Sequence, residues 1–174
     1  GMNIRVLLLA FGTDSTAPWY HDPLVQAAEV AWKNGIFVVI SAGNDGEGAK
    51  WTGSLSNPAR SPNLMTVGAT DTVATSSLGD DTVPNFSSSG NAVRRVDAVA
   101  PGAHIVSLKA PGSYAATNFA ATGNVGDRFF RGSGTSQAAA VVAGSAALII
   151  QQRPTISPQE LKNLLASSAT VLMN

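Results

Sequence analysis

Two aliphatic runs and a helix pattern between them organise the amino-terminal part of the chain. Residues 4–10 and 36–40 are rich in aliphatic side chains, which is typical of strands covered on both faces in a parallel sheet. Between the runs, Asp22 and Pro23 form a helix start signal, and Gly35 is a stop signal. The pattern predicts a strand–helix–strand unit with a right-handed parallel crossover.

The middle of the chain is polar and rich in glycine, with shorter apolar runs. Residues 64–68 predict a third strand, and residues 104–108 predict a shorter one. The stretch 110–131 is rich in Gly, Ala, Asn and Thr, and we interpret it as a long surface loop.

Two helices are predicted near the carboxyl end. The pattern over residues 135–152 is apolar on all sides, which is typical of a central buried helix. Within it, Gly144 suggests tight packing, because glycine costs ~1 kcal/mol against alanine in a helix. Ser157, Pro158 and Glu160 give the last helix a complete start signal. With no repeat or linker, residues 1–174 predict one α/β domain with a parallel sheet between helices.

Charge and composition exclude several classes of protein. Lys plus Arg and Asp plus Glu each number 11, so a neutral chain has no general attraction for nucleic acid or a membrane surface. The absence of cysteine excludes disulfide scaffolds, thiolate metal sites and cysteine nucleophiles. No run reaches the ~18 apolar residues of a membrane span. Residues 6–11 are too short for a signal-peptide core, and no cleavage site follows them.

Two segments carry candidate chemistry. Residues 132–144 place Ser136 at the start of the long helix, where free N–H groups and the helix dipole would stabilise an oxyanion beside a serine nucleophile. Asn44 follows the second strand, at the sheet edge where open α/β folds bind ligands, and its amide could donate to the same oxyanion. The plainer alternatives are a helix cap formed by Thr135 or Ser136 and a turn at Asn44.

Five motifs in a fixed order favour the catalytic interpretation. They are AGNDG at 42–46, VGAT at 67–70, FSSSG at 86–90, DAVAPG at 97–102 and GTS at 134–136. The series resembles the carboxyl-terminal half of the subtilisin-like serine peptidases, the subtilases, over nearly the whole chain. The resemblance implies a three-layer α/β/α fold with a parallel sheet, of which this chain carries the last four strands and the nucleophile helix.

The resemblance also implies an active site. Ser136 matches the nucleophile, and Asn44 and the Ser136 N–H match the donors of the oxyanion hole. The positions that match the substrate-binding segments are Ala10, Phe11, Gly12, Ser41, Ala42, Gly43, Asn57, Pro58 and Ala59, with a cis proline common at Pro58 in the family. Asp97 matches an acidic residue near a weak cation site of some relatives; no other metal or cofactor is implied.

Other features depart from the family pattern. Ala10 and Leu8 stand where Ser and Asn are usual, and Gln137, Ala140 and Val141 replace the usual Met, Pro and His. No motif for the triad Asp or His is present, and neither His21 nor His104 matches the triad base. A serine hydroxyl without its base is a weak nucleophile.

Three functional hypotheses remain open. The first is a subtilase-type serine endopeptidase, extracellular by resemblance and present as a fragment that is inactive alone. Its exposed strand at 4–10 would self-associate or pair with a complementary amino-terminal half. The second is a pseudoenzyme that binds peptides. The third is an esterase or other hydrolase in which His21, with Asp14 or Asp22, serves Ser136.

Overall fold

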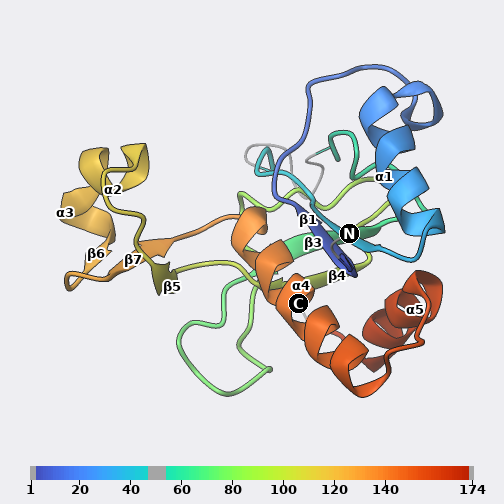
Figure 1. Ribbon diagram of the computed structural model, residues 1–174. Helices are drawn as coiled ribbons and strands as arrows, with labels where there is room; N and C mark the ends of the chain where they lie inside the picture. Colours follow the sequence, from blue (N-terminus) through green and yellow to red (C-terminus); the bar gives the residue numbers. More distant parts are fainter. Residues whose placement is uncertain (1–2, 47–53, 173–174) are drawn as a thin grey trace.

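The computed structural model describes residues 3–46 and 54–172, and its centre is a four-stranded sheet in the order β1-β2-β3-β4 (Figure 1). All three neighbouring pairs in this sheet are parallel. The strands are β1 (Val6–Leu9), β2 (Phe37–Ser41), β3 (Met65–Thr70) and β4 (Ala98–Pro101). The predicted parallel α/β class is confirmed.

Helices cover both faces of the sheet. They are α1 (Pro23–Lys33), α4 (Thr135–Gln152) and α5 (Pro158–Ser168). Phe37 and Val39 of β2 belong to the apolar core that α4 and α5 cover, whereas Val38 and Ile40 lie in the core that includes Ala28 of α1. Every residue of β2 is buried because successive side chains enter opposite layers. This alternation produces the predicted three-layer arrangement.

The predicted helix starts are confirmed. The Asp22 carboxylate caps α1 by accepting hydrogen bonds from the Leu24 and Val25 N–H groups at 2.9 and 3.2 Å. At α5, Ser157 and Glu160 form the reciprocal capping box. These caps fix the residue at which each helix begins.

The fourth strand of the main sheet was not among the strands that the sequence pattern predicted. It is β4, which pairs with β3 through Gly68 and Val99. The run predicted at 104–108 does form a strand, β5 (Ile105–Leu108), but this strand belongs to a second sheet. The chain changes direction between the two strands, where His104 has a left-handed backbone with φ 58°.

The predicted loop at 110–131 is wrong. It contains α2 (Tyr114–Asn118), α3 (Ala120–Gly123), β6 (Asn124–Val125) and most of β7 (Phe129–Gly132). The order of the second, antiparallel sheet is β5-β7-β6, and it projects from the body of the molecule (Figure 1). The segment is rich in small residues, which give no clear hydrophobic periodicity. One of them is required by packing: a Cβ on Gly123 would lie 2.1 Å from the Phe130 ring, so α3 needs glycine there to pack on β7.

The long helix α4 is buried on one face only, which corrects the prediction of a helix buried all round. Ala138, Val142 and Ala146 lie in the core, but Val141 is 39% exposed and Leu148 is 64% exposed. Tight packing at Gly144 is also wrong, because no described neighbour lies within 4 Å of the position a Cβ would take there. No helix in the described ranges is long and apolar enough to span a membrane.

Candidate functional site

Ser136 lies in the first turn of α4, as predicted. Its Oγ donates a 3.2 Å hydrogen bond to the carbonyl oxygen of Ala10, just beyond the carboxyl end of β1. Within residues 3–46 and 54–172, nothing accepts a hydrogen bond from the Ser136 N–H. The helix start therefore offers a hydroxyl and a free backbone donor at the same place.

Asn44 is held next to this helix start by its amide carbonyl. Its Oδ1 accepts hydrogen bonds from the Thr135 N–H at 2.9 Å and from the Thr135 Oγ1 at 3.0 Å. The Gly43 N–H donates in turn to Thr135 Oγ1 at 3.2 Å. Because the carbonyl is engaged, the amide is oriented and its NH2 group carries the side chain's donors.

Gly134 permits the close approach of these groups. A Cβ at this position would lie 2.8 Å from Gln137 Oε1 and 3.4 Å from Asn44 Nδ2. A side chain here would contact the Asn44 amide and would require the end of the Gln137 side chain to move. The glycine of the GTS motif thus lies in direct contact range of both amide side chains beside the candidate nucleophile.

Two serines of the FSSSG motif support the loop that carries Asn44. Ser88 accepts a hydrogen bond from the Asp45 N–H at 3.3 Å, and its own N–H donates to the Gly43 carbonyl at 3.0 Å. Ser87 accepts from the Ala69 N–H of β3 at 2.9 Å. The motif links the loop to the centre of the sheet, which the sequence alone did not reveal.

The predicted substrate-binding segments lie at the carboxyl ends of the strands. The Thr13 N–H donates to the Asn57 carbonyl at 2.8 Å, so the segment after β1 lies beside the segment that contains the cis Asn57–Pro58 bond. Ser41 and Ala42 are buried at the end of β2, and the segment 10–12 is exposed. Ala59 is buried. The binding roles of these positions stay predictions.

Asn57 and Asp22 form a buried polar pair behind these segments. Asn57 Nδ2 donates to Asp22 Oδ2 and to the Ala17 carbonyl, each at 3.1 Å. Burial alone would raise the pKa of Asp22, but hydrogen bonds from the Val25 N–H and other donors outweigh it and hold the pKa below its ordinary value. The hydrogen bonds of this carboxylate therefore go to the first turn of α1 and to Asn57.

Neither histidine is placed as a base for Ser136. The His21 ring packs on Tyr20 with centroids 4.6 Å apart, and His104 Nε2 lies 3.8 Å from Asp71 Oδ2. No hydrogen bond or ion pair in the described part of the chain joins either histidine to Ser136. This geometry does not support the hypothesis that His21 serves as the base of a hydrolase.

Comparison with known proteins identifies the family of the chain. The profile of the Subtilase family matches residues 1–174. The chain belongs to the Subtilase family. It is 44% identical over 147 residues to the serine protease AprX of Bacillus subtilis (strain 168), covering 83% of this chain and 32% of AprX. It is 36% identical over 172 residues to Subtilisin Savinase of Lederbergia lenta, covering 99% of this chain and 51% of that protein.

Solved structures show the same subtilase fold. A prenylagaramide maturation protease, PagA, is 28% identical with a TM-score of 0.67, covering 97% of this subtilase chain and 52% of that one. A cold-adapted subtilisin-like serine proteinase is 29% identical with a TM-score of 0.64, covering 94% and 48% respectively. This chain thus spans between about a third and about half of the length of these relatives.

Proposed function

We propose that this subtilase chain carries the nucleophile and oxyanion hole of a serine endopeptidase. Ser136 Oγ attacks the carbonyl carbon of a peptide bond, and the resulting oxyanion accepts hydrogen bonds from Asn44 Nδ2 and the Ser136 N–H. The base that takes the Ser136 proton passes it to the leaving nitrogen, and expulsion of the amine leaves an acyl-enzyme on Ser136, which water then hydrolyses. The observation that carries the proposal is the pair of hydrogen bonds from Thr135 that aims the Asn44 amide beside the start of α4.

The proton of Ser136 needs an acceptor that the described residues do not supply. The hydroxyl donates to the Ala10 carbonyl, which is not a base strong enough to remove that proton. We therefore assign the base, and the carboxylate that orients it, to a complementary amino-terminal half. The chain alone then hydrolyses peptides negligibly, because loss of triad members removes on the order of 10⁶-fold of the rate in a related enzyme.

The exposed edge of β1 and the exposed face of α4 support the proposal that a complementary half binds this chain. Among the described residues β1 is an edge strand, and Leu8 is 37% exposed on it. The outward face of α4 adds Val141 and Leu148. An unpaired aliphatic edge beside an apolar helix face favours association, so we expect the chain to self-associate where that half is absent. Peptide or protein substrates and an extracellular location, as in the family resemblance, complete the proposal.

A fluorophosphonate probe tests the proposal because it reports the activation of one serine. We expect Ser136 to be labelled, and chromogenic peptides to be cleaved, by the full gene product together with whatever half carries the base. The Ser136→Ala variant should lose both signals. The chain alone should show neither.

Other outcomes would decide between the hypotheses. Peptide binding without labelling in every form would establish a pseudoenzyme. Robust Ser136-dependent turnover by the chain alone would overturn the assignment of the base to another half. Ester hydrolysis that His21→Ala abolishes and His104→Ala spares would instead establish the hydrolase based on His21.

A further inference from the structure

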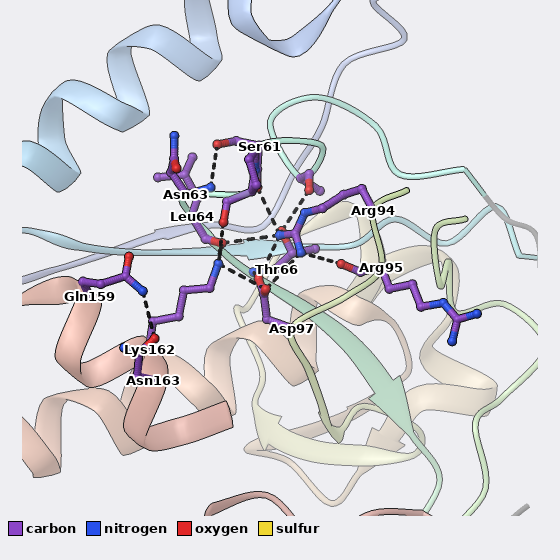
Figure 2. A network of polar contacts seen from close by, with 12 residues as sticks. Ser61, Asn63, Leu64, Thr66, Arg94, Arg95, Asp97, Gln159, Lys162 and Asn163 are labelled. Carbon is purple, nitrogen blue, oxygen red and sulfur yellow. Dashed lines mark hydrogen bonds and ion pairs between the residues drawn. The ribbon is translucent and has the colours of Figure 1, made fainter. Parts of the chain in front are cut away.

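Asp97, the residue just before β4, has a carboxylate that contacts two cations, Arg94 and Lys162 (Figure 2). Asp97 forms a bidentate pair with Arg94, with Nη1 at 2.9 Å from Oδ1 and Nη2 at 2.8 Å from Oδ2. Oδ2 also accepts from the Thr66 N–H at 2.8 Å. Lys162 Nζ lies 3.1 Å from Oδ1. The four contacts use all of the ~four lone-pair positions that a carboxylate offers.

The Lys162 ammonium is enclosed by oxygen atoms. Besides Asp97, it donates to the carbonyl oxygens of Pro62 and Leu64, each at 2.8 Å. Its side chain reaches this place from α5 and is only 10% exposed. Burial lowers the pKa of Lys162, and the charge and hydrogen bond of Asp97 oppose that change.

These three oxygens are the ligands that a hard cation prefers. Calcium in proteins is bound by carboxylate and backbone carbonyl oxygens at ~2.3–2.6 Å, with waters completing the shell. The weak cation site that the family resemblance implies near Asp97 would use such a set. A metal does not fit here, however, because Lys162 already engages all three oxygens and the Arg94, Asp97 and Lys162 charges sum to one positive charge.

We propose that the Lys162 ammonium is a built-in replacement for a bound metal cation. It neutralises the same oxygens and ties α5 to the start of β3 and to the segment before β4. A covalently attached cation does not dissociate, so the link between these elements does not depend on the metal concentration. Removal of the ammonium leaves the Pro62 carbonyl and one carboxylate position of Asp97 without a partner, while the Leu64 carbonyl keeps only the long 3.5 Å hydrogen bond from Arg94 Nη2. These three oxygens then form a site for a hard cation such as Ca²⁺.

Calcium titrations of variants test this proposal. In Lys162→Ala we expect a lower Tm in choline chloride, a saturable rise of Tm on addition of CaCl2, and one calcium bound per chain by calorimetry. The wild type should show no calcium response beyond a choline chloride control of equal ionic strength. Lys33→Ala is the matched control, because it removes an exposed lysine and should behave as the wild type does.

Asp97 must be part of the new site if the proposal is correct. Adding Asp97→Asn to Lys162→Ala should abolish calcium binding. Where Lys162→Ala does not fold, Lys162→Gln keeps the stem and one donor and should show the same calcium response more weakly. A wild type that binds calcium through Asp97 would overturn the proposal, and so would folded Lys162 variants that bind none.

Discussion

Asn44 and Thr135 lie 91 positions apart in the sequence, and the Oδ1 of Asn44 accepts a 2.9 Å hydrogen bond from the Thr135 N–H. The bond joins the end of β2 to the start of α4. It satisfies one of the free N–H groups of the helix while it orients the amide beside Ser136. The same side chain therefore accepts from the helix start and, in the proposed function, would donate to the oxyanion.

Replacement of Asn44 by alanine should affect the chemical step. In the active form of the protein, we expect Asn44→Ala to lower kcat by ~10²–10³-fold with little change in KM, because the amide bond strengthens as negative charge develops. Steady-state kinetics on a chromogenic peptide measure both constants. Asn118→Ala, which removes an exposed amide in α2, should change neither. A change confined to KM would assign Asn44 to substrate binding instead.

Thr135 should act by positioning Asn44. Thr135→Val keeps the backbone N–H and the side-chain shape but removes the hydroxyl that bonds Asn44 and accepts from Gly43. We expect kcat to fall less than in Asn44→Ala, with a loss of ~1–3 kcal/mol in stability because the Gly43 N–H loses its partner. Kinetics and urea unfolding measure the two effects. An unchanged kcat would show that the backbone bond alone orients the amide, and exposed Thr155→Val serves as the control.

Local sequence patterns were sufficient for β1, β2, β3 and the starts of α1 and α5, but not for β4. The Asp22–Pro23 and Ser157–Pro158 signals located both helix starts because a cap involves only neighbouring residues. The run at 36–40 identified β2 because burial on both faces removes polar residues from a strand. Composition failed at 110–131, where small residues pack because Phe130 covers Gly123, a contact that no periodicity records.

Contacts between distant segments explain what the sequence could not show. Ser136 was predicted at the helix start, but its hydrogen bond to Ala10 spans 126 positions. Lys162 bonds the Leu64 carbonyl across 98 positions, and a lysine on a surface helix gives no signal of such burial. The sequence pattern did not predict that one face of α4 is exposed. An apolar pattern indicates which side chains favour burial, but it does not show whether other described residues cover them.

Stability should depend on pH through the Asp22 cap. The pKa of Asp22 is held below its ordinary value of 3.8, so its contribution is present above that value and is lost as pH falls through the lowered pKa. We expect Asp22→Asn, which can still cap α1, to cost ~1 kcal/mol at pH 7 and to differ less from the wild type near pH 3. Urea unfolding across this pH range measures the difference, with exposed Asp14→Asn as the control.

The outward face of α4 should drive association of the isolated chain. Leu148 is 64% exposed there, so transfer of this face into a protein interface removes apolar surface from water. We expect light scattering to show mass growing with concentration for the wild type, and Leu148→Glu to shift the chain toward monomer, since burial of an unpaired carboxylate is costly. Val93→Glu is the matched control, because Val93 is 94% exposed in the loop before β4 and should not alter the mass. A wild-type monomer at high micromolar concentration, with cooperative unfolding, would contradict the prediction and show that neither this face nor the β1 edge needs a partner.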